Sequence, residues 1–185
     1  MFLASALVIQ LLSFKKYRIG YLLQELNIND GYIVFQDIQL KVPQGRNVKI
    51  DCLILSSYGI FVISSKKYRG WITGYEGNPI WNVSFFNKSK SVPNPILENN
   101  DKIKLLEQLL GRGLFISIIC TTFIKGLSII SPEVHVTNER EVMKTILRYR
   151  KNIFSPEDLL KMENIILRNI ITDNPSLTIS LEKNG

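Results

Sequence analysis

The strongest constraint on the fold is a pair of apolar runs that only a short connection separates. Val48–Leu55 ends in Cys-Leu-Ile-Leu, and Ile60–Ser64 begins with Ile-Phe-Val-Ile. Both runs contain the β-branched and aromatic residues that favour strands. The four residues between them, from Ser56 to Gly59, include a glycine and are typical of a β-hairpin. The sequence therefore predicts two adjacent antiparallel strands in a central sheet.

The other patterns predict strands and helices around this hairpin. An apolar helix is expected at Phe2–Leu26, and helices that begin at Asn94-Pro95, Asn138 and Ser155-Pro156 are expected to end near Leu110, Tyr149 and Ile170. Further strands are expected at Tyr32–Leu40, Trp71–Tyr75, Ile80–Phe85 and Leu114–Cys120, with another near Val134. This order predicts a mixed α/β sheet domain.

Composition narrows the classes of function. The chain of 185 residues is 45% hydrophobic and 21% charged, which is typical of one globular domain. Its net charge of +7 favours polyanionic partners such as nucleic acid or an anionic membrane. His135 is the only histidine, which argues against zinc clusters and catalytic sites that need several histidines. Cys52 and Cys120 lie in apolar runs and are expected to be buried thiols, in keeping with a cytoplasmic protein.

The N-terminal segment leaves two interpretations open. Met1–Phe14 is apolar and is followed by Lys15, Lys16 and Arg18, but a bilayer span needs about 20 apolar residues. Residues 1–17 are therefore either a helix packed on the core or a partner, or an anchor remnant that associates with a membrane. Residues 18–170 are the expected domain, and residues 171–185 form a polar tail.

Asp51 and Lys66 are the residues of the hairpin that carry chemistry. Asp51 lies near the start of the first strand, and Lys66 is expected just past the end of the second. Because the strands are antiparallel, these two ends lie side by side. An acid and a lysine that converge at one sheet edge can hold a divalent cation and polarise a water beside a phosphate.

The same stretch resembles the NERD family, the nuclease-related domain of the PD-(D/E)xK superfamily. In that family a strand with an aspartate precedes a strand that ends in Glu-x-Lys, which an aromatic residue, a basic residue and a glycine follow. The matching segments are Asp51, Gly59–Ile63, Ser64–Lys66, Tyr68–Gly70, Trp81, Asn94–Asn99, Arg18–Gly20 and the region from Val136 to Leu167. The resemblance implies a central mixed sheet of the αβββαβ nuclease type flanked by helices, with an added β-hairpin and two C-terminal helices.

Three positions depart from the family pattern. Tyr21 stands in place of a glutamate in the first helix, Ser64 in place of the glutamate of Glu-x-Lys, and Glu98 in place of a glutamine. Glu98 offers a relocated carboxylate at the start of a helix, and Glu25 is a weaker substitute one turn beyond Tyr21.

The resemblance therefore supports two hypotheses. In the first, a hydrolase cleaves DNA or RNA with Asp51, Lys66 and Glu98, and Asp51 and Glu98 hold Mg²⁺ or Mn²⁺. The substrate contacts would then come from Ser64, Lys67, Arg69 and Asn94. In the second, an inactive nuclease fold binds nucleic acid, a membrane or a protein. A fold alone does not decide between them.

Overall fold

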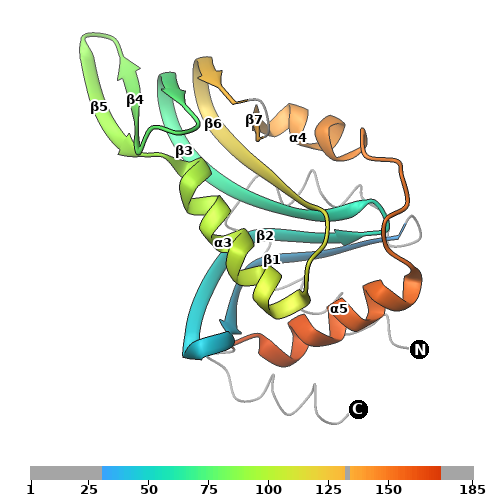
Figure 1. The fold of residues 1–185 in the computed structure, drawn as a ribbon. Helices are drawn as coiled ribbons and strands as arrows, with labels where there is room; N and C mark the ends of the chain where they lie inside the picture. The colour runs from blue at the N-terminus through green and yellow to red at the C-terminus, as the bar shows by residue number, and fades with distance from the viewer. Residues whose placement is uncertain (1–30, 132–133, 172–185) are drawn as a thin grey trace.

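The protein is described here from a computed structural model, which defines residues 31–131 and 134–171. Seven strands form one sheet, and three α-helices of the described residues lie against it (Figure 1). The strands are β1 (Tyr32–Val42), β2 (Arg46–Ser56), β3 (Gly59–Tyr75), β4 (Ile80–Phe85), β5 (Lys88–Pro93), β6 (Phe115–Ile130) and β7 (His135–Asn138). The helices are α3 (Pro95–Leu110), α4 (Glu139–Ile146) and α5 (Pro156–Asn169), and a 3-10 turn, η2 (Pro43–Gly45), joins β1 to β2.

The sheet is mixed. The strands β1 to β5 pair in sequence order as antiparallel neighbours, whereas β6 runs parallel to β3 and β7 runs parallel to β6. The predicted central hairpin is β2 and β3, which pair from Cys52 opposite Ile63 to Ser56 opposite Gly59. The predicted α/β fold, with a central sheet flanked by helices, is thus confirmed.

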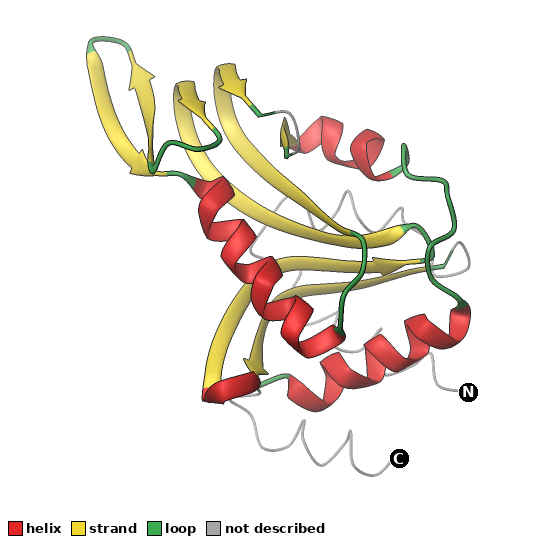
Figure 2. Ribbon diagram, in the orientation of Figure 1, coloured by secondary structure: helices red, strands yellow, loops and turns green. Residues whose placement is uncertain are grey.

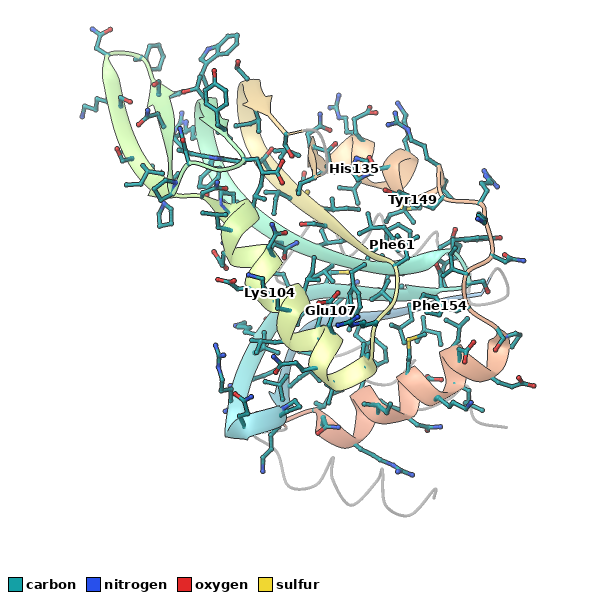
Figure 3. All side chains as sticks on the ribbon, in the orientation of Figure 1. Phe61, Lys104, Glu107, His135, Tyr149 and Phe154 are labelled. Atoms are coloured by element: carbon teal, nitrogen blue, oxygen red, sulfur yellow. The ribbon has the colours of Figure 1, made fainter. Side chains whose placement is uncertain are left out.

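Alternating side chains of the central strands pack on opposite faces of the sheet. Leu53 and Leu55 of β2 join a core cluster with Leu105 and Leu106 of α3, and α5 closes the same cluster. Cys52 and Ile54 join a second cluster, which α4 covers. Figure 2 shows the helices against the strands. On the α4 side the ring of Phe61 meets that of Tyr149 edge-on at 5.4 Å, and His135 hydrogen-bonds to Tyr149 (Figure 3).

The predicted starts of α3, α4 and α5 are confirmed by hydrogen bonds of their capping side chains. Asn94, Asn138 and Ser155 each accept hydrogen bonds from backbone N–H groups in the first turn of α3, α4 and α5. Ser155 and Asp158 form a complete capping box. The helix α4 ends at Ile146, three residues earlier than expected.

The strand predictions were wrong in three places, and in one of them the strand expected at Leu114–Cys120 continues to Ile130 as β6. The runs Ile60–Ser64 and Trp71–Tyr75 belong to one strand of 17 residues, so Lys66 lies inside β3 and not past its end. The reason is β6, which pairs with β3 on both sides of a bulge at Gly70. The strand β5 was missed because its polar sequence, Lys-Ser-Lys-Ser-Val-Pro, has little β-propensity.

The aromatic residues of β3, β4 and the turn that follows β4 divide between core and surface. Trp81 is 0% exposed, as expected of a core residue, but Trp71 is 57% and Phe86 83% exposed. The core cluster of the β3–β4 hairpin contains Ile72, Trp81 and Val83, whose side chains lie on one face of the two strands, whereas Trp71 points to the other face.

The buried thiols are confirmed, since Cys52 and Cys120 are both free and 0% exposed. Burial raises the pKa of the Cys120 thiol to about 12. The predicted apolar helix, including Met1–Phe14, and most of the predicted tail lie outside the described residues. None of the helices within residues 31–131 and 134–171 is long and apolar enough to cross a bilayer.

Replacing Gly74 by alanine should test the packing around Trp81. A Cβ at Gly74 would collide with the buried indole ring, and such overpacking costs about 1–3 kcal/mol of unfolding free energy. A Cβ at Gly77, in the turn of the same hairpin, meets no atom within 4 Å. Urea denaturation should therefore show a loss for Gly74→Ala and a change within about 0.5 kcal/mol for Gly77→Ala. Equal losses would contradict this packing.

Candidate nucleic-acid site

The candidate site lies where one edge of β3 loses its neighbour. The β2 ladder ends at the pair Cys52–Ile63, and the β4 ladder begins at the pair Trp71–Ser84. Between them, Ser64 to Lys67 of β3 pair with β6 alone. In Figure 1, β1 and β2 diverge from β3 and β6 here, with α3 running over the sheet. We call Asp51, Ser64, Lys66, Glu98 and Lys102 the fork site.

Asp51 reaches the unpaired edge of β3 from β2. Ile50 and Leu53 pack in the same core cluster although two residues separate them, so the alternation of β2 breaks at Asp51 and Cys52. Half-buried Asp51 accepts a hydrogen bond of 2.8 Å from the backbone N–H of Ser65. The carboxylate thus replaces the strand partner that this N–H would have in a continuous ladder.

Ser64 is bound to α3 through a buried amide. Its hydroxyl donates to Asn99 Oδ1 at 2.7 Å, and both residues are almost inaccessible to solvent. The amide nitrogen of Asn99 donates to the carbonyl oxygen of Val62 at 2.9 Å and to Ser117 Oγ at 2.8 Å. The side chain of Asn99 therefore joins α3, β3 and β6, and satisfied buried bonds of this kind hold elements in one arrangement.

Glu98 lies between two lysines. Lys66 Nζ of β3 is 2.6 Å from Glu98 Oε2, and Lys102 Nζ, one turn along α3, is 3.1 Å from Glu98 Oε1. Lys102 Nζ also donates to Ser64 Oγ at 3.1 Å. The lysine side chains are 22% and 14% exposed, whereas Glu98 is 46% exposed. Both oxygens of this carboxylate are thus engaged, and the three side chains carry one net positive charge.

Burial and the charges of the fork site shift the pKa of Glu98 and of the neighbouring Tyr68. Burial raises the pKa of Glu98, but the hydrogen bonds and charges of Lys66 and Lys102 outweigh burial, and the pKa falls below its usual 4.5. Burial, followed by the charge of Glu98, raises the pKa of Tyr68 to about 12. At neutral pH Glu98 is therefore ionised and Tyr68 is neutral.

The other predicted substrate contacts lie in different surroundings. Asn94 is 2% exposed, and its side chain caps α3 and donates to the carbonyl oxygens of Tyr75, Glu76 and Asn78. These bonds give Asn94 a structural role, which is to fix where α3 begins. Lys67 and Arg69 are exposed on β3, and the Arg69 guanidinium lies 4.5 Å from the centre of the Phe85 ring.

The Mg²⁺ that the resemblance implies does not fit this set of donors. Mg²⁺ is held by one or two carboxylates with water and substrate phosphate. Here Ser64 supplies a hydroxyl where the family has a carboxylate, and both oxygens of Glu98 already bind ammonium groups. Nowhere in the described part of the chain do three or more histidine, cysteine, aspartate or glutamate residues gather as metal ligands would.

Sequence reasoning missed Lys102, Asn99 and Tyr68. A local signal existed for Lys102, because it lies four residues after Glu98 and an acid and a lysine at this spacing share a helix face. Asn99 and Tyr68 lie in segments that match the family motifs, but no local pattern indicates the contacts of Asn99, since its partners come from two distant strands.

The stability that Glu98 contributes should depend on pH. A carboxylate whose pKa is lowered by folding stabilises the protein above its unfolded value, and the gain is lost as pH falls through the folded value. We expect Glu98→Gln to lose no more than about 1 kcal/mol at pH 7, because solvent screens the half-exposed pair. Urea denaturation should show this difference shrinking below pH 4.5. A difference that stays constant down to pH 3 would contradict the ion pairs.

Similarity to known proteins indicates the family of this chain. An uncharacterized protein of Bacillus anthracis is 29% identical over 147 residues, which is 77% of this chain and 69% of that protein. No solved structure matches the chain. The sequence model of the nuclease-related domain matches residues 13–129, which is more than half of the 185 residues and includes the whole fork site. The chain therefore belongs to the nuclease-related domain family, NERD.

Proposed function

We propose that this nuclease-related domain binds the phosphodiester backbone of nucleic acid at the fork site and does not cleave it with Mg²⁺. The ion pairs of Glu98 carry the proposal, because both of its carboxylate oxygens already bind lysine ammonium groups. A metal ion would have to displace Lys66 and Lys102 to use this carboxylate. A phosphate, in contrast, is attracted by the same two lysines.

Charge and family membership support a nucleic-acid partner. The chain has a net charge of +7, and neutralising phosphates with lysine and arginine supplies most of the affinity of non-specific nucleic-acid binding. Lys66 occupies the lysine position of the family motif, while the exposed side chains of Lys67 and Arg69 follow it on β3. The backbone contacts in this proposal carry no information about base sequence.

Metal-dependent cleavage of DNA or RNA is the second candidate function. Asp51 favours it, because this carboxylate keeps the family position and touches β3 at Ser65, next to Lys66. In this alternative Asp51 and Glu98 are the metal ligands and Lys66 stabilises the developing charge. The lysines on Glu98 weigh against it. Association of residues 1–14 with a membrane is a separate proposal, which the described residues do not bear on.

Plasmid DNA should distinguish the two functions. We expect the natural protein to leave supercoiled plasmid intact in Mg²⁺ or Mn²⁺, as in EDTA, because the carboxylate set is incomplete. Nicking would be followed on agarose gels, with Asp51→Ala as the control. Metal-dependent nicking that disappears in Asp51→Ala would establish the enzyme and contradict the binding proposal.

Replacing Lys66 by alanine should lower the affinity for nucleic acid by about the contribution of one phosphate contact. Fluorescence anisotropy with a labelled duplex should show Lys66→Ala losing about tenfold in affinity and about one unit of salt slope. Lys104→Ala is the matched control, since Lys104 is 70% exposed on α3 and pairs with Asp101. Unmeasurable binding by the natural protein, or equal effects of the two variants, would contradict the proposed function.

A further inference from the structure

The ammonium of Lys102 lies between Ser64 and Glu98, two of the positions that depart from the family pattern. Its Nζ is 3.1 Å from Ser64 Oγ, at the family's glutamate position, and 3.1 Å from Glu98 Oε1, at the family's glutamine position. We infer that Lys102 is the built-in cation of the fork site, and that one phosphate group binds between Lys66 and Lys102 without a divalent metal. This inference rests on the proposed function.

A chain of buried hydrogen bonds orients Ser64 toward Lys102. The carbonyl oxygen of Val62 can only accept, so the atom of Asn99 beside it is the amide nitrogen, and Asn99 Oδ1 faces Ser64. The Ser64 hydroxyl proton is therefore directed to Asn99, and its oxygen lone pairs are left for Lys102. The oxygen of Ser64 is thus oriented to accept from Lys102 and holds its ammonium in place. A solvated surface lysine has no such fixed acceptor.

Glu98 occupies the position that a phosphate would take. Its two oxygens bridge Lys66 and Lys102 at 2.6 and 3.1 Å, as two oxygens of a phosphate group would. Glu98 is 46% exposed, whereas the lysines are 22% and 14% exposed. The carboxylate is therefore the most accessible of the three groups, and an incoming phosphate can exchange for it while both ammonium groups stay in place.

The alternative is that Lys102 only forms an intrahelical ion pair. Exposed pairs at this spacing contribute a few tenths of a kcal/mol to the stability of a helix. The low exposure of Lys102 and its bond to Ser64 on β3 set it apart from Lys104, which pairs with Asp101 within α3 and is 70% exposed. These two lysines of one helix therefore make a matched comparison.

Anisotropy with a labelled DNA duplex tests the role of Lys102 in binding. We expect Lys102→Met to lose about tenfold in affinity, Lys102→Arg to retain it, and Lys104→Met to bind like the natural protein. Glu98→Gln should bind more tightly than the natural protein, because the competing carboxylate is gone. Binding by the natural protein should not require Mg²⁺ and should persist in EDTA. If Lys66→Ala weakens binding while Lys102→Met does not, the inference fails and the proposed function stands.

Mn²⁺ titration followed by calorimetry tests the same idea without nucleic acid. We expect no Mn²⁺ binding by the natural protein, and a new site in Ser64→Glu/Lys102→Met, which restores the family carboxylate and removes the ammonium. Circular dichroism and thermal melting establish that each variant is folded. Mn²⁺ binding by the natural protein that Glu98→Gln abolishes would overturn the inference. A protein that binds neither Mn²⁺ nor nucleic acid would overturn the proposed function and this inference with it.

Discussion

The arrangement of the whole domain depends on the pairing of β3. This strand of 17 residues pairs with β6 over nearly its full length, and with β2 and then β4 on its other edge. Because the ladder with β2 ends before the ladder with β4 begins, a short stretch of β3 pairs with a neighbouring strand on one side only. That stretch contains Ser64, Ser65 and Lys66, so the interruption of one ladder leaves unpaired the strand edge from which the site is built.

Polar groups placed at such an interruption must be satisfied, and the fork site satisfies them with side chains. Asp51 accepts the N–H of Ser65, and Asn99 binds Val62, Ser64 and Ser117. Unmade bonds there would cost about 1–3 kcal/mol each. The same bonds that close the gap also fix α3 across it, and α3 brings Glu98 and Lys102 to β3. The structural and the chemical roles of this helix are therefore inseparable.

The fold could be predicted further than the site. Strands β2 and β4 and helices α3 and α5 follow from apolar patterning, turn residues and capping residues, which act over a few positions. The full length of β3 could not, because it depends on pairing with β6, which is distant in sequence. The strand β5 could not, because its polar sequence has little β-propensity, although its partner β4 is adjacent in the chain. At the site, Asp51 and Lys66 were found from their strands, and Glu98 from the family pattern.

The sequence by itself determined the family, the central hairpin, the starts of α3, α4 and α5, and three charged residues of the site, Asp51, Lys66 and Glu98. Only the tertiary structure decided what those charges do. Lys66 and Glu98 are 32 residues apart and meet because α3 crosses the sheet, and Lys102 reaches Ser64 across 38 residues. Local sequence patterns indicate secondary-structure propensity and hydrophobic periodicity. Long-range packing determines which residue a charged side chain pairs with. For this reason the sequence predicts that the Glu98 carboxylate is a metal ligand, whereas in the fold this carboxylate pairs with two lysines.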